Sequence, residues 1–161
     1  MRATSDRLTH DAQRETNDLV DAMLLSSRAL VAVSARSIAA AQGVTVPQFR
    51  MLVVLDAGPT NLSGLAYALD VAPSTAMRMV DRLVEAGTVA RTVLPDNRRE
   101  THLSLTPSGR RTVRTVTTRR RRDLQAVVER IPAARRAAVD AMADFAAAAD
   151  QVWPHQPVAG I

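Results

Sequence analysis

Residues 62–106 decide the fold, and they read LSGLAYALDVAPSTAMRMVDRLVEAGTVARTVLPDNRRETHLSLT. Apolar residues recur at helical spacing in a short segment and, after a break, in a longer one. Two segments that alternate apolar and polar residues follow, one on each side of a polar turn. The order of these patterns predicts a helix, a turn, a second helix and a two-stranded β-ribbon.

The two predicted helices have clear start and stop signals. The first spans Leu62–Leu69 with Asn61 as its N-cap, and residues 70–72 break the pattern. The second begins at Pro73, because the missing N–H of proline is harmless in a first helical turn. Gly87 marks its end. The predicted buried face of the second helix consists of Ala76, Met79, Val80 and Leu83.

The opposite face of the second helix is small, polar and basic. It carries Ser74, Thr75, Met77 and Arg78, followed by Asp81 and Arg82. A DNA major groove admits one α-helix and is read by side chains near that helix's N-terminus. Hydroxyls bind phosphates or base edges, a guanidinium binds guanine, and a methionine packs on a thymine methyl group. The alternative is a solvated helix face, and this pattern alone does not decide between the two.

The predicted ribbon favours DNA binding. Thr88–Leu94 and Glu100–Leu105 have strand character, and Pro95–Asn97 forms the turn between them. We expect Arg98 and Arg99 at the tip, where an arginine can enter the electronegative minor groove. The alternative is an ordinary surface hairpin. Helix, helix and basic ribbon in this order predict a winged helix-turn-helix.

These residues resemble the MarR family of bacterial transcription regulators. The matching motifs are Gly43–Phe49, Leu65–Val71, Pro73–Thr75, Val80–Leu83 with Gly87, Pro95-x-Asn97-Arg98-Arg99, and Leu103-x-Leu105-Thr106-x-x-Gly109. The resemblance covers residues 44–111 by motif and the whole chain by element order. Five residues depart from the family pattern: Asp70 stands where glycine is common, Ala72 replaces a serine N-cap, Met77 a small polar residue, Leu94 an acidic residue and Asn97 an aspartate.

The resemblance implies a homodimeric, sequence-specific DNA-binding regulator that represses transcription from a near-palindromic operator. It also implies that a small phenolic or anionic ligand releases the protein from DNA. That ligand would bind between the dimer helices and the winged helix-turn-helix, which we call the DNA reader. Met23, Phe49 and Arg50 are candidates for that ligand site by placement only, and core packing is the alternative for the two apolar ones. We predict DNA contacts from Ser63, Ser74, Thr75, Met77, Arg78, Arg82, Arg98 and Arg99.

The rest of the chain is predicted to be helical on both sides of the reader, which gives a mainly α fold with a small β-wing. The expected segments are a polar arm at residues 1–11, helices at Ala12–Gln42, Val46–Ala57, Pro107–Arg130 and Ala133–Val152, and a tail at residues 153–161. The apolar residues of the first helix cover more than one face. This favours burial against a second chain, and a core helix of a monomer is the alternative.

The last helix carries a second apolar seam. Ala138, Met142, Phe145, Ala149 and Val152 are spaced as in a coiled coil. We therefore expect residues 1–42 to form the arm and a dimerisation helix, and residues 43–106 to form the DNA-binding domain. Residues 107–161 would supply the C-terminal dimerisation helices and the tail.

Charge suits a polyanionic partner. The 161 residues carry a net charge of +5, and the chain has no lysine, so that charge comes from arginine. Arg110, Arg111 and Arg114 lie nearest the wing and are candidates for phosphate contacts. For the run Arg119–Arg122, a solvated face, salt bridges and DNA contacts all stay open.

Composition excludes several other functions. The chain has no cysteine, which excludes disulfides, thiol-based sensing and most zinc sites. No run of about 18 apolar residues occurs, so we expect a cytoplasmic protein without a membrane partner. His10, His102 and His155 are scattered, so we expect neither an enzyme nor a cofactor. The main rival is a winged helix that binds proteins without specific DNA binding.

Overall fold

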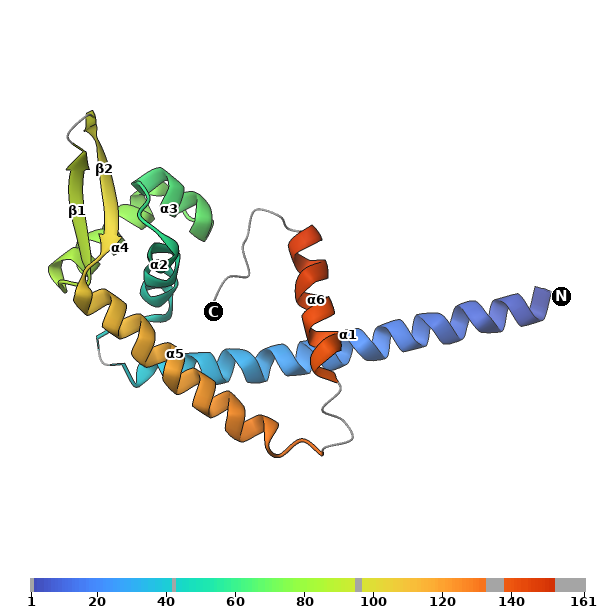
Figure 1. Cartoon of the computed structure of the whole chain (residues 1–161). Helices are drawn as coiled ribbons and strands as arrows, with labels where there is room; N and C mark the ends of the chain where they lie inside the picture. Colours follow the sequence, from blue (N-terminus) through green and yellow to red (C-terminus); the bar gives the residue numbers. More distant parts are fainter. Residues whose placement is uncertain (1, 42, 95–96, 133–137, 153–161) are drawn as a thin grey trace.

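A computed structural model describes residues 2–41, 43–94, 97–132 and 138–152 (Figure 1). In chain order the elements are α1 (Arg2–Ala39), α2 (Val46–Ala57), α3 (Leu62–Leu69), α4 (Pro73–Glu85), β1 (Val89–Leu94), β2 (Asn97–Leu105), α5 (Pro107–Val128) and α6 (Ala138–Val152). The fold is mainly α-helical with a small antiparallel wing, as predicted. Figure 1 shows the wing on one side of the molecule and the N-terminal end of α1 on the other.

Most predicted boundaries are confirmed within a few residues, and two are wrong. α1 begins at Arg2, so the segment predicted as a polar arm is helical. β2 begins at Asn97, which places Asn97–Arg99 in a strand and not in a turn. Residues 133–137, where the last helix was predicted to start, and the predicted tail after Val152 lie outside the described residues.

Local signals form the helix-turn-helix as predicted. Asn61 Oδ1 accepts a hydrogen bond of 2.8 Å from the amide of Gly64 and so caps α3. Asp70 follows α3 in the left-handed conformation, with φ 52°, which aspartate tolerates better than most residues. Pro73 starts α4 without a side-chain cap, and Gly87 follows the helix at φ 68°. The left-handed conformation of Asp70 turns the chain between α3 and α4, and Gly87 turns it from α4 toward β1.

The core connects the helix-turn-helix to the other helices through α2. Thr45 and Gln48 form a capping box at the start of α2. The helix then packs on α3, α5 and β2, burying Phe49, Met51, Leu52 and Leu55. The predicted inner face of α4 is confirmed, with Ala76, Val80 and Leu83 buried and Met79 partly buried.

The wing is a β-hairpin with one additional strand-like contact. β1 pairs with β2, and the register shifts between Val93 and Leu94. Thr60, just before α3, forms an isolated bridge with Leu103 through two backbone hydrogen bonds of 3.1 and 2.7 Å. Sequence analysis missed this bridge, because a single residue pair leaves no alternating pattern. The bridge ties the base of the wing to the start of α3.

From His10 onward, only the C-terminal part of α1 is buried within the chain. Val33, Ser34, Ser37 and Ile38 are buried, and α1 packs on α5. From His10 to Ala32, the side chains are exposed except for the partly buried Met23 and Leu30. The exposed apolar residues of this segment are Leu19, Val20, Leu24, Leu25 and Val31. Residues 10–32 are therefore not a core helix of the single chain.

The start of α5 is fixed against the start of the wing. Thr106 Oγ1 accepts a hydrogen bond of 3.1 Å from the Gly109 amide and donates one of 2.7 Å to the Gly87 carbonyl. Gly109 lies so close to Thr88 that a Cβ at this position would be 2.1 Å from the carbonyl oxygen. A glycine is needed here because two backbone segments approach each other closely.

The predicted seam on α6 faces solvent in the single chain. Met142, Phe145 and Val152 are exposed, and Ala149 is partly buried. The side chain of Ala138 lies outside the described residues. The described apolar residues of this seam therefore present an uncovered surface.

Candidate nucleic-acid interface

α4 exposes most of the residues predicted to read DNA. Ser74, Met77, Arg78 and Arg82 are exposed, and Thr75 is partly buried. Met77 leaves 43% of its surface exposed although the neighbouring Ala76 is fully buried. One face of α4 thus packs on the core, and the opposite face is accessible to a DNA major groove.

Two of these side chains contact each other. Arg78 Nη2 donates to Thr75 Oγ1 at 3.4 Å, which is long for a hydrogen bond between nitrogen and oxygen. Such a weak contact can be exchanged for a base or a phosphate at little cost. Ser63, in the first turn of α3, is also exposed.

The predicted wing arginines lie at the far end of the ribbon. Arg98 and Arg99 are near the start of β2, whereas the end of β2 leads into α5 (Figure 1). Asn97 pairs with Leu94 beyond the shift in register. The side chains of residues 94–100 lie outside the described part of the structure. Entry of these arginines into a minor groove therefore stays a prediction.

An arginine that sequence analysis missed joins the wing to α4. Arg91 Nη2, on β1, donates to Asp81 Oδ1 at 2.5 Å and lies 3.5 Å from the Met77 sulfur. A signal was present in the sequence, because side chains two apart along a strand share a face. Arg91 shares its face with Val89, which is buried, so its side chain leaves the strand on the side that faces α4.

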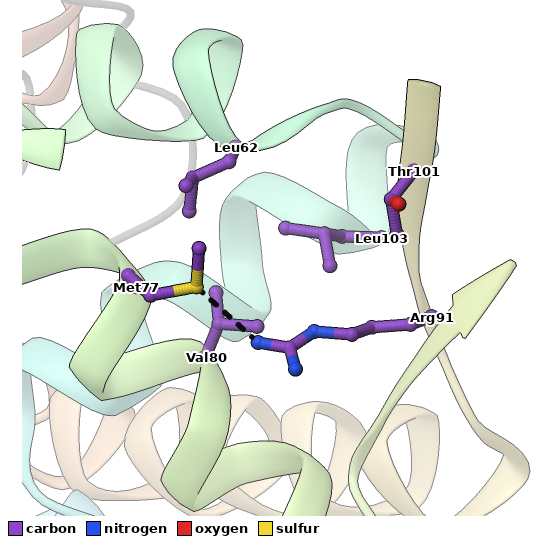
Figure 2. Close-up of a pocket in the computed structure, with 6 residues that line it drawn as sticks. All are labelled: Leu62, Met77, Val80, Arg91, Thr101 and Leu103. Atoms are coloured by element: carbon purple, nitrogen blue, oxygen red, sulfur yellow. Dashed lines mark hydrogen bonds between the residues drawn. The ribbon is translucent and has the colours of Figure 1, made fainter. Parts of the chain in front are cut away.

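A cavity of about 230 Å³ lies between the wing and α4, beside the contact of Arg91 with Met77 (Figure 2). Its lining residues are Leu62, Met77, Val80, Arg91, Thr101 and Leu103. Figure 2 shows the Arg91 side chain extending from β1 toward the Met77 sulfur. α3, α4 and both strands therefore contribute to one small junction beside the reading face.

The predicted phosphate contacts near the start of α5 differ from one another. Arg111 and Arg114 are exposed, as a phosphate contact requires. Arg110 Nη1 donates to the carbonyl of Leu105 at 2.8 Å. Arg110 therefore binds the end of the wing, a backbone contact that sequence analysis did not foresee.

Further along α5, the arginine run spreads over more than one face. Arg120 is partly buried, and this burial lowers the pKa of its guanidinium group. Arg119, Arg121 and Arg122 are exposed. A hollow of about 380 Å³ is lined by Arg114, Thr115, Thr118, Arg119 and Arg122. α5 thus carries a basic surface of its own.

The remaining candidates do not form a common site. His10 is exposed on α1, His102 is partly buried on β2, and His155 lies outside the described residues. In the described ranges, no three His, Cys, Asp or Glu side chains lie as a metal ion would require. No helix within these ranges is long and apolar enough to cross a membrane.

The residues suggested for a ligand site have different surroundings. Phe49 is 2% exposed and belongs to the hydrophobic core, so its role in packing is confirmed. Arg50 is exposed on α2, and Met23 is partly buried on the segment of α1 that lies outside that core.

Known proteins with similar sequences and folds support the assignment of a winged helix-turn-helix. The family model described as MarR family matches residues 44–101, from the residue before the α2 cap into β2. The crystal structure of RV1404 from Mycobacterium tuberculosis is 45% identical, with 83% of this chain and 93% of that chain covered and a TM-score of 0.76. The chain belongs to the MarR family.

Two further relatives are informative about this MarR family protein. A candidate transcriptional regulatory protein for the hcr operon of Thauera aromatica is 38% identical over 76 residues. That match covers 47% of this chain and 46% of the relative, so the chain spans about half of the relative's length. CouR from Rhodococcus jostii, solved with bound p-coumaroyl-CoA, is 25% identical, with 76% of this chain and 85% of that chain covered and a TM-score of 0.60.

Proposed function

We propose that this MarR family transcriptional regulator is a homodimer that binds a specific sequence in double-stranded DNA and represses transcription. The observation that carries the proposal is the exposed face of α4, with Ser74, Met77 and Arg78 near its N-terminus. Side chains in this position read base edges when a helix enters the major groove. The buried face of the same helix keeps them in place.

The predicted contacts divide into two kinds. Ser74, Thr75, Met77 and Arg78 read bases, whereas the arginines that meet phosphates supply affinity that falls with salt. Arg98 enters the minor groove beside the major groove that α4 occupies, with Arg99 next to it. Ser63 and Arg82 contact the DNA backbone at the edges of the same surface.

The homodimer is supported by apolar surfaces that the chain itself does not cover. Residues 10–32 of α1 expose five large apolar side chains, and α6 exposes Met142, Phe145 and Val152. Contiguous exposed apolar surface marks protein interaction sites. Residues 1–42 and 107–161 would form the dimer, and residues 43–106 would read DNA. Two α4 helices related by a two-fold axis would enter successive major grooves about 34 Å apart, so the operator is near-palindromic.

Release from DNA by a small phenolic or anionic ligand completes the proposal. The ligand would stabilise dimers in which the distance between the two α4 helices does not match the operator. The fraction of protein bound to DNA would then fall. The p-coumaroyl-CoA bound to the relative CouR supports an anionic ligand. The arginine-lined hollow on α5 supports the same charge.

Fluorescence anisotropy tests the proposal. The purified protein is titrated with DNA from upstream of its own gene and with scrambled DNA, at two salt concentrations. A preference for the upstream DNA that survives the higher salt supports a specific regulator. Equal binding to both DNAs, lost at higher salt, contradicts it and favours a winged helix that binds proteins.

A further inference from the structure

Arg91 lies on the strand face that is directed toward the body of the protein. Side chains alternate along a strand, so Arg91 shares its face with Val89, which is 2% exposed. Its cross-strand partner is Leu103, which is also buried. The Arg91 side chain is 38% exposed, and its guanidinium group reaches Asp81 and Met77 on α4.

One nitrogen of Arg91 contacts two successive turns of α4. Nη2 is 2.5 Å from Asp81 Oδ1 and 3.5 Å from the Met77 sulfur. Residues four apart lie on the same helical face, so Met77 and Asp81 form one contact surface for Arg91. The ion pair is substantially exposed, and such pairs contribute little to fold stability. The main effect of the ion pair is therefore on the orientation of neighbouring side chains and not on the stability of the fold.

The geometry concerns the direction of the Met77 side chain. Methionine is unbranched and flexible, and Met77 borders a cavity of about 230 Å³ (Figure 2). The free space lets the side chain turn either into the cavity or out toward a bound groove. The contact with Arg91, which Asp81 holds in place, selects one of these directions.

We propose that Arg91 is a positioning residue for sequence readout. With Asp81 it orients Met77, and Met77 meets one base pair in each half of the operator. This inference rests on the proposed function, because it requires specific DNA binding. The contact is apolar, so it distinguishes a thymine methyl group from the other edges in the major groove. Arg91 acts through Met77 and does not touch that base.

A direct phosphate contact by Arg91 is the competing role, and the two roles differ in what they change. Loss of a phosphate contact weakens binding to all sequences alike and lowers the salt slope by about one. Loss of a positioning residue changes the preference at one base pair and leaves the salt slope as it was.

The first experiment needs no DNA. Methyl NMR of methionine-labelled protein follows Met77, with its signal assigned through Met77→Leu. In Arg91→Gln and Asp81→Asn, the Met77 signal is expected to shift toward the position of a freely rotating side chain. Arg91→Lys is expected to be intermediate, since an ammonium pairs with Asp81 as a point charge without the planar fork. Arg36→Gln, an exposed arginine on α1, removes the same charge and serves as the control.

The second experiment measures base preference. Each variant is titrated with the operator and with a set of single base-pair substitutions, at several salt concentrations. We expect the wild-type protein to distinguish the pair contacted by Met77 by about tenfold, and Arg91→Gln to reduce this to below about threefold. Preferences at the other positions stay within about twofold. Thermal melting verifies that each variant is folded. If Arg91→Gln does not fold, the base preference of Asp81→Asn is used in its place.

Each outcome has one reading. An unshifted Met77 signal in both Arg91→Gln and Asp81→Asn overturns the positioning role. Uniform weakening with a lower salt slope overturns it as well and assigns Arg91 to a phosphate. A wild-type protein without any base preference contradicts the proposed function and removes the readout role, while the NMR result still reports whether Arg91 orients Met77.

Discussion

Ser37 on α1 and Asp123 on α5 are joined by a hydrogen bond in which Ser37 Oγ donates to Asp123 Oδ2 at 3.0 Å. Ser37 is completely buried, and its hydroxyl also lies 2.9 Å from the carbonyl of Val33 in its own helix. An ionised carboxylate is a stronger acceptor than a carbonyl. The proposed dimerisation helix is thus attached by a polar contact to the helix that leaves the wing.

Ser37→Ala is expected to lower the free energy of unfolding by about 1–2 kcal/mol, because Asp123 loses a donor in a partly buried setting. Urea unfolding measures the change. Ser34→Ala is the matched control, since Ser34 is also buried on α1 but its hydroxyl bonds to Leu30 in the same helix. Equal losses in the two variants would show that the contact between helices adds nothing.

Arg98→Ala is expected to weaken DNA binding several-fold without changing the melting temperature. The loss should be smaller at high salt, because a contact in the minor groove is electrostatic. Anisotropy titrations at two salt concentrations measure it, with Arg36→Ala on α1 as the control for charge. Unchanged affinity at moderate salt would defeat the assignment of Arg98 to the groove.

Phe145→Glu is expected to dissociate the proposed dimer, since burial of an unpaired carboxylate in an apolar interface is costly. Met142→Glu should act in the same way. Sedimentation velocity reports the change from dimer to monomer. Ala147→Glu, at an exposed position on the same helix but away from the seam, should leave the dimer intact. A dimer that persists in both seam variants would remove α6 from the interface.

Gly109→Ala is expected to destabilise the fold by about 1–3 kcal/mol, because the new methyl group would overlap the Thr88 carbonyl. The junction of wing and α5 has to move to accept it. Thermal or urea unfolding measures the loss. Ser108→Ala, in the same first turn, is the control and should change stability by less than about 0.5 kcal/mol. A similar result for both would mean that the backbone shifts easily here.

The helix-turn-helix could be predicted because its signals are local. Asn61 caps α3, Pro73 starts α4, and Gly87 follows its end, each within a few residues of the element it defines. The boundaries of α2 and α3 agree with the prediction for the same reason. The MarR resemblance rests on the same short motifs, which is why it was visible in one sequence.

The contacts missed by sequence analysis join distant residues. The Thr60–Leu103 bridge and the contact of Arg91 with Asp81 connect elements whose relative position no local pattern gives. The extent of α1 was missed for another reason. Its first ten residues are mostly polar and lack the apolar period that was used to find helices. The DNA contacts themselves stay predictions, because they depend on a partner and on side chains beyond the described residues.

The way α1 is anchored has a mechanical consequence. From His10 onward the helix is buried only near its C-terminal end, and the stretch from His10 to Ala32 is a rod about 35 Å long at 1.5 Å per residue. A rod fixed at one end converts rotation into displacement, so a tilt of about 10° at Ser37 moves His10, about 40 Å away along the helix, by about 7 Å. Small changes in packing between α1 and α5 therefore become a larger displacement of any partner chain that binds the N-terminal half of α1.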